Sequence, residues 1–268
     1  MKRSDLIRPI LLLTGVWALG GLILRVITLT RSINEDGLVR VGSPALAITM
    51  VFSLLGMGLL TWFCLRLNRL PGSEACFPVA GGLRGAMFAA PILLLAGCFV
   101  SLAAPVESRD DALRIADLAG VGMALLMGAT LLIRPGKSRF WPRFLPAVWA
   151  LAMMILRFRS WTQDPLIIRI APTLMAVLCD LLSLMLLSGF SLGAGHRRST
   201  VLFGLAAGVF TLMSVPDHLT GLYGTVGELL ALLGLAVWNV GHALGLLRPE
   251  VQQEEPPEAA AEAQEAAE

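Results

Sequence analysis

The sequence has few charged residues for its length: 15% of its 268 positions are Asp, Glu, Lys or Arg, against about 25% in an average soluble domain. Apolar residues make up 56%. They are gathered into repeated runs of roughly 20 residues, the length of helix that crosses a ~30 Å hydrocarbon core. A soluble domain of this size can bury an apolar core, but not a series of such runs. The shortage of charge therefore excludes an ordinary soluble fold and predicts a membrane protein.

Sequence motifs that identify a reaction or a cofactor are also scarce. The four cysteines, Cys64, Cys76, Cys98 and Cys179, form no CxxC pair and have no zinc-ligand spacing, so we interpret them as small buried thiols. There is no HExxH zinc motif and no Walker phosphate-binding loop. We therefore expect no metal, no cofactor, no nucleic-acid partner and no catalytic residue. A non-enzyme is favoured, although a lack of motifs does not exclude an enzyme.

The apolar runs predict an all-α, polytopic membrane protein with about eight transmembrane helices in the lipid bilayer. Helices satisfy their own backbone hydrogen bonds in lipid, and runs of this length are too long for the strands of a barrel. Sequences rich in Pro, Gly and Asp punctuate the connections. The expected helices cover residues 7–30, 43–65, 85–104, 113–133, 144–160, 166–189, 199–215 and 222–247.

Basic residues are distributed unequally among the connections, which predicts the orientation, because cytoplasmic connections are enriched in Lys and Arg. Thirteen fall on the side of the N-terminus and seven on the other side. An even number of helices then places both termini in the cytoplasm of a multi-pass protein of the cell membrane. The thirteen are Lys2, Arg3, Arg8, Arg66, Arg69, Arg84, Arg134, Lys137, Arg139, Arg143, Arg197, Arg198 and Arg248.

The C-terminal segment, residues 249–268, has a different composition from the rest of the chain. It holds seven of the nineteen acidic residues and no Lys or Arg. Because it has almost no apolar bulk to bury, it is typical of a disordered and solvated segment. We interpret it as an acidic cytoplasmic tail.

The two halves of the chain resemble each other. Residues 16–25 and 148–157 share seven of ten positions, including a Trp and an Arg within the helix. Asp117 and Glu228 fall in equal register in the fourth and eighth expected helices. We expect a parallel 4+4 internal repeat, since transporter folds commonly contain repeats; chance similarity between apolar segments is the alternative. The expected units are a first membrane half, 1–136, and a second membrane half, 137–248.

Four charged residues lie inside the expected helices at similar depth on the outer side: Arg25, Arg157, Asp117 and Glu228. A charge deep in a membrane helix costs about 2.5–3.5 kcal/mol on insertion scales, so such groups usually face a cavity or one another. We expect Arg–acid pairing around a polar vestibule that binds an anionic or zwitterionic solute. The alternative is that Arg157 extends to the lipid headgroups and Asp117 caps its helix.

Asp180 stands alone in an apolar stretch of the sixth expected helix. Its functional interpretation is proton or cation coupling, because intramembrane acids are often functional. Its structural interpretation is a hydrogen bond to Asn239 or His242 of the eighth helix. Asn239 and His242 share a helix face, for which packing is the simpler interpretation. The adjacent Asp217 and His218 resemble half of a catalytic pair, but we expect them in a loop after the seventh helix.

Three classes of function remain open from the sequence. A small-solute transporter or membrane ligand-binding protein is favoured by the repeat and the embedded charges. A non-transporting interaction or regulatory membrane protein is the alternative, since a fold does not determine a function. An intramembrane enzyme is least favoured, because no catalytic constellation is visible.

Overall fold

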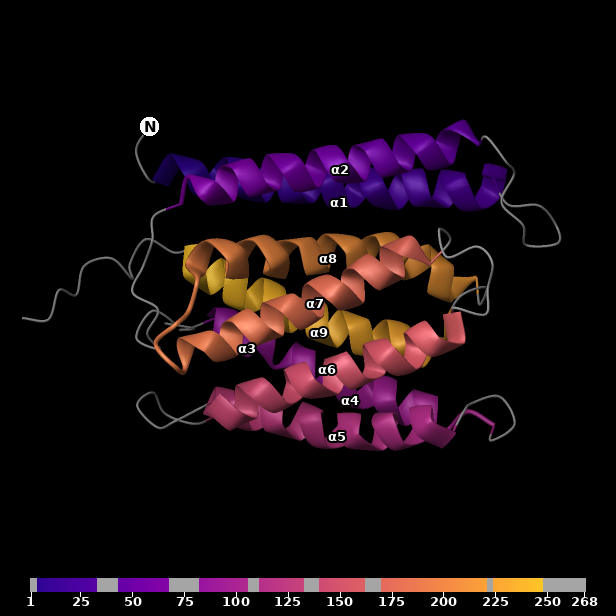
Figure 1. The fold of residues 1–268 in the computed structure, drawn as a ribbon, viewed down its shortest axis with the longest axis vertical. Coiled ribbons are helices and arrows are strands. Elements are labelled where there is room, and N and C mark those ends of the chain that lie inside the picture. The colour runs from indigo at the N-terminus through magenta and orange to yellow at the C-terminus, as the bar shows by residue number, and fades with distance from the viewer. Residues whose placement is uncertain are drawn as a thin grey trace, which may run out of the picture.

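The computed structural model describes residues 4–32, 43–67, 82–105, 111–132, 140–161, 170–220 and 224–247, and every regular element in these ranges is a helix. The acidic tail and most of the charged connections considered above lie outside the described residues. In chain order the helices are α1 Ser4–Ser32, α2 Pro44–Leu65, α3 Gly82–Met87, α4 Ala89–Leu102, α5 Asp111–Leu132, α6 Phe140–Trp161, α7 Ala171–Phe190, α8 Arg197–Leu219 and α9 Val226–Leu247 (Figure 1).

The long helices confirm a helical, multi-pass membrane protein. Seven spans are long and apolar enough to cross a membrane, with α3 and α4 together forming one of them. The helix α6 is not among the seven, although its 22 residues match the length of the others. Three arginines, Arg143, Arg157 and Arg159, lower its hydropathy. The expected count of eight therefore stays a prediction that depends on α6.

A proline explains why one expected helix is divided into α3 and α4. Pro91 lies in the first turn of α4, and its ring has no N–H and clashes with the carbonyl group four residues earlier, which belongs to Met87. The chain therefore leaves the α-helical pattern at Phe88, whose N–H bonds the carbonyl oxygen of Gly85 at 3.2 Å. The run of apolar residues continues across this break, so the sequence predicted a single helix.

The helices pack as a closed ring of six with a hairpin attached outside it. Around the ring the order of contact is α4, α9, α8, α7, α6 and α5, and α5 returns to α4. The hairpin of α1 and α2 attaches to the ring through α8. Figure 1 shows this hairpin along one edge of the molecule and α5 along the opposite edge. We call the end of the bundle at which α1 finishes, at Ser32, the distal end.

Two apolar core clusters hold this arrangement together, and α7 and α9 contribute to both. One cluster joins the hairpin to α8, with Trp17 in edge-to-face contact with Phe210 at 5.3 Å between ring centroids. The other fills the space between α4, α5, α6, α7 and α9. Large apolar side chains also face outward, among them Leu54, which is 72% exposed, and Ile115, which is 70% exposed. An outer surface of this kind suits contact with lipid.

Glycines allow α4 and α9 to approach closely. A Cβ atom on Gly97 would lie 2.5 Å from the backbone nitrogen of Ala231, and one on Gly234 would lie 2.7 Å from the carbonyl oxygen of Ala90. Small residues at helix interfaces are a common means of close packing in membranes. The contact fixes the position of α9, and with it Glu228 in the first turn of that helix.

Candidate functional site

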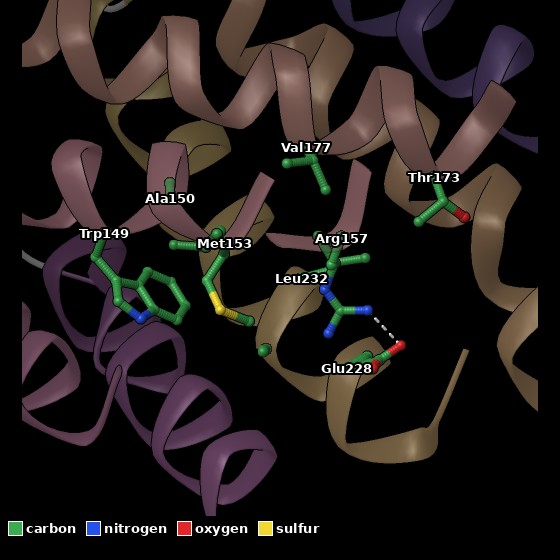
Figure 2. A pocket seen from close by; sticks show the side chains of 10 residues that line it. Trp149, Ala150, Met153, Arg157, Thr173, Val177, Glu228 and Leu232 are labelled. Carbon is green, nitrogen blue, oxygen red and sulfur yellow. Dashed lines mark ion pairs between the residues drawn. The ribbon is translucent and has the colours of Figure 1, made fainter. Parts of the chain in front are cut away.

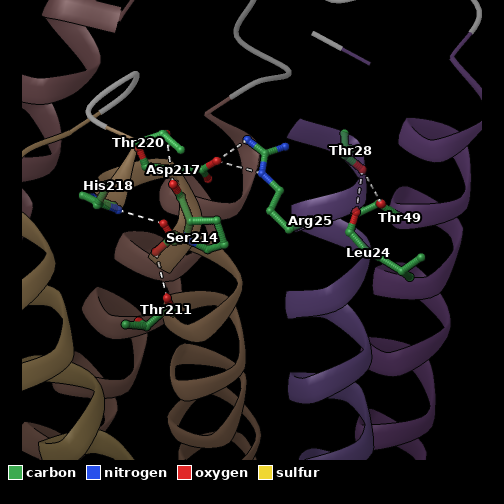
Figure 3. Close-up of polar contacts among 10 residues, drawn as sticks. Leu24, Arg25, Thr28, Thr49, Thr211, Ser214, Asp217, His218 and Thr220 are labelled. Atoms are coloured by element: carbon green, nitrogen blue, oxygen red, sulfur yellow. Dashed lines mark hydrogen bonds and ion pairs between the residues drawn. The ribbon is translucent and has the colours of Figure 1, made fainter. Parts of the chain in front are cut away.

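Arg25 forms a buried ion pair with Asp217, which joins the hairpin to the ring at the distal end. Its Nε donates to Asp217 Oδ1 at 2.9 Å, and its Nη2 lies 2.8 Å from the same oxygen. Arg25 is 2% exposed and Asp217 is fully buried. Asp217 Oδ2 has no hydrogen-bond partner among the described residues. Figure 3 shows the guanidinium extending from α1 to the end of α8.

The expectation that Asp217 and His218 lie in a loop is wrong, because both belong to the last turn of α8. The helix continues through Pro216 to Leu219, and His218 Nδ1 lies 2.9 Å from the carbonyl oxygen of Ser214 in the preceding turn. Pro216 suggested a helix end in the sequence. Because the helix continues, Asp217 points at Arg25 from a fixed position instead of lying in a loop.

Arg157 and Glu228 form a second ion pair at the same end, with Nη1 2.5 Å from Oε2 (Figure 2). Glu228 Oε2 also accepts a hydrogen bond from the backbone N–H of Thr225 at 3.2 Å, and the Glu228 N–H donates to Thr225 Oγ1 at 3.3 Å. This reciprocal arrangement is a capping box at the start of α9. Glu228 therefore holds both Arg157 and the first turn of its own helix.

His218 stands beside this second pair. A Cβ atom added to Gly224 would lie 2.4 Å from His218 Cδ2 and 3.0 Å from Glu228 Oε2, so Gly224 fits between them only because it has no side chain. The two ion pairs are thus linked by neighbours in sequence, since Asp217 binds Arg25 while His218 adjoins Glu228. Asp117, the fourth expected member of the charged group, is buried on α5, and its role stays a prediction.

Asp180, Asn239 and His242 lie deeper in the bundle. Asn239 Nδ2 donates to Asp180 Oδ1 at 2.7 Å, which connects α7 to α9. His242 Nδ1 lies 2.9 Å from the carbonyl oxygen of Trp238, and the two rings are 4.7 Å apart. The structure therefore joins Asp180 to Asn239, while these contacts of His242 stay within its own helix.

Each ion pair borders a cavity. Arg157 and Glu228 line a small cavity of about 30 Å³ between α6, α7 and α9, which is room for a water molecule. Trp149, Met153 and Leu232 form its apolar walls (Figure 2). Arg25 lines a larger pocket of about 270 Å³ between the hairpin, α7 and α8. Its other lining residues are Leu46, Thr49, Met50, Ser53, Leu54, Met57, Ala171, Pro172, Met175, Phe210 and Met213.

Residues 189–193 (GFSLG) match the GxSxG pattern in which serine hydrolases carry their nucleophile. That pattern needs a strand, a sharp turn and a helix around the serine. Ser191 instead follows the end of α7, and its Oγ accepts a hydrogen bond from Arg143 Nη1 at 3.0 Å. The surroundings differ from a hydrolase site and resemble an anchor between α6 and α7.

Comparison with family models, with curated protein sequences and with solved structures gives no match for the chain. Within the described residues, no group of three or more His, Cys, Asp or Glu side chains is placed to hold a metal ion. Function is therefore inferred from the geometry of the polar groups and their pockets.

Proposed function

We propose that the protein binds an anionic or zwitterionic amphiphile from the bilayer in the pocket between the hairpin, α7 and α8. Arg25 would contact the polar head of the ligand, and the apolar side chains that line the rest of the pocket would contact its hydrocarbon chain. The observation that carries the proposal is the double position of Arg25: it is the ion-pair partner of Asp217 and also a wall of an apolar pocket.

The dimensions and lining of the pocket support an amphiphile rather than a small polar solute. From Leu46 to Met57 the wall contributed by α2 covers twelve residues, and the eleven steps between them make about 16 Å of helix at 1.5 Å per residue. Four methionines line it, and this flexible, polarizable side chain adapts to irregular apolar shapes. Leu54 is exposed on the outer surface, so a ligand can enter sideways from the lipid.

Arg25 holds Asp217 through Nε and Nη2, which both contact one carboxylate oxygen. A ligand carboxylate or phosphate can share the cation or compete with Asp217 for it. Competition would loosen the link between hairpin and ring, and this loosening is the conformational step that transport or signalling would require.

The remaining features of topology form part of this proposal. We propose that α6 is the eighth span, because pairing of Arg157 with Glu228 lowers the cost of its charge in lipid. Both termini then lie on one side, which the basic connections assign to the cytoplasm of the cell membrane.

The internal repeat is also proposed, on the evidence of Trp17 and Trp149, which are both buried eight residues before an ion-paired arginine. The acids do not follow the same register. Arg157 pairs within the second half, whereas Arg25 of the first half pairs with Asp217 of the second.

A comparison of matched ligands tests the binding proposal. Thermal stability is measured in nonionic detergent with a long-chain fatty acid and with the alcohol of the same chain length. We expect the acid to raise the melting temperature more than the alcohol, and Arg25→Gln to abolish this difference. Arg157→Gln is the matched control, because it removes a paired arginine outside the pocket and should preserve the difference.

Two outcomes contradict the proposal. Equal shifts with acid and alcohol mean that Arg25 does not recognise the head. No shift with either ligand supports the alternative class, an interaction or regulatory protein in which a partner helix covers the pocket.

A further inference from the structure

A second polar site lies in the interior of the ring, away from the pocket of Arg25. Asp180 and Ser183 on α7 and Asn239 on α9 are each 0% exposed. Asp180 and Ser183 are one helical turn apart and therefore share a face. The 2.7 Å hydrogen bond from Asn239 Nδ2 to Asp180 Oδ1 brings the amide against the carboxyl group.

Among the residues that the structure describes, each of these three side chains has an oxygen atom without a hydrogen-bond partner: Asp180 Oδ2, Ser183 Oγ and Asn239 Oδ1. Buried polar atoms in proteins are nearly always hydrogen-bonded, so three neighbouring exceptions require an explanation. Ser183 is one of three buried hydroxyl residues, with Thr173 and Thr211, whose oxygen has no hydrogen-bond partner among the described residues. Hydroxyl groups on membrane helices commonly bond the carbonyl oxygen four residues earlier, as Ser53 bonds Thr49 at 2.8 Å, but Ser183 does not.

The three oxygens belong to the ligand types that a hard cation selects, a carboxylate, an amide carbonyl and a hydroxyl. Only Asp180 carries a formal charge, and within the part of the chain that the structure describes its carboxylate accepts a hydrogen bond from the neutral Asn239. One carboxylate balances one positive charge. Divalent calcium sites usually employ several carboxylates, and softer metals prefer His or Cys.

We propose that Asp180, Ser183 and Asn239 bind a small monovalent cation of the size of Na⁺ between α7 and α9. The cation would satisfy the three unpartnered oxygens and neutralise the carboxylate in an apolar interior. It would connect two helices that also border the cavity of Arg157 and Glu228, so occupancy would rigidify the core of the ring.

Cation-dependent stability tests this site. The full chain is purified in nonionic detergent, and its melting temperature is compared in NaCl, KCl and choline chloride at equal ionic strength. A ligand that binds only the folded state stabilises it by mass action, and saturating Na⁺ should raise the melting temperature by roughly 5–10 °C over choline. The shift should vanish in Asp180→Asn, shrink in Ser183→Ala and persist in Asp111→Asn, which changes an exposed acid at the start of α5.

The outcomes separate the alternatives. A melting temperature that is equal in NaCl and choline chloride overturns the site, and so does a Na⁺ shift that survives in Asp180→Asn. If Asp180→Asn does not fold, Ser183→Ala decides, because it keeps the carboxylate and removes one oxygen; an unchanged Na⁺ shift in that variant overturns the proposal. A stability that responds to proton concentration but not to Na⁺ means that Asp180 is protonated rather than ion-bound, which also overturns it.

Discussion

Arg25 and Asp217 are separated by 192 positions in the chain, yet the guanidinium and the carboxylate meet in a buried ion pair with both nitrogen contacts on one oxygen. The pair joins the first hairpin to the ring, and its arginine also lines a mainly apolar pocket. A contact that is both a structural link and a wall of a pocket is a suitable place for a ligand to act.

Removing one partner of this pair should destabilise the protein much more than removing both. A single Arg25→Met or Asp217→Leu change leaves a buried charge uncompensated, which typically costs about 3–5 kcal/mol. The double variant replaces the pair by apolar groups and should be less destabilised than either single variant. Denaturant titration in detergent gives the free energy of unfolding of the unmodified protein, both single variants and the double variant, which together form a double-mutant cycle. Additive effects would mean that the two charges do not depend on each other.

Glu228 has two roles that two substitutions can separate. Glu228→Gln should keep the capping box, because Gln serves there as well as Glu, but it removes the charge that pairs with Arg157. Thr225→Ala keeps the ion pair and removes the hydroxyl of the cap, at about 1 kcal/mol. We expect Glu228→Gln to cost more than Thr225→Ala in the free energy of unfolding. The reverse order would show that the helix cap, and not the ion pair, is the more important contact.

Close packing of α4 against α9 predicts opposite effects for two glycines. Gly97→Ala should destabilise the protein by about 1–3 kcal/mol, because the new methyl group meets the backbone of α9 and overpacks the interface. Gly122→Ala on α5 is the matched control. A Cβ atom there meets nothing within 4 Å, so helix propensity should stabilise it by roughly 0.5–1 kcal/mol. Equal effects of the two changes on thermal unfolding would contradict the packing described.

Labelling from one side of the membrane tests whether α6 is a span. In a variant without cysteines, Ser138→Cys precedes α6 and Thr162→Cys follows it. An impermeant maleimide applied outside should label position 162 and leave position 138 unlabelled until the membrane is opened. Labelling of both positions from the same side would mean that α6 does not cross, and that the number of spans is odd.

The sequence was sufficient to predict the helices but not their partners. Run length and connection residues located the long helices to within a few residues, since the thickness of a bilayer sets the length of a membrane helix. The division into α3 and α4 at Phe88 was not predicted, because the apolar composition continues across it, although Pro91 marks the position. Composition reports where a helix can form, whereas a local change in backbone geometry depends on single residues.

Prediction of the charged contacts was less complete, for physical reasons. Asp217 follows a proline, which suggested the end of a helix, and nothing local shows that its partner lies 192 positions earlier. The capping box of Thr225 and Glu228 is visible in the sequence as T-x-x-E. It was not predicted, because the expected helix began at residue 222 and both residues then lay inside it. For Asp180 the sequence indicated two hydrogen-bond partners, Asn239 and His242, and the structure shows the bond to Asn239.

The most direct test of the central claim is photolabelling with a long-chain fatty acid that carries a diazirine in its chain, followed by mass spectrometry of the protein in nanodiscs. If the pocket binds the fatty acid, labels should appear on the pocket residues Met50, Leu54, Met57 or Met175, and labelling should be lost in Arg25→Gln and in the pocket-filling variant Met57→Trp. Labels spread over the lipid-facing surface, including Ile115 on α5, and unchanged by either substitution, would contradict it.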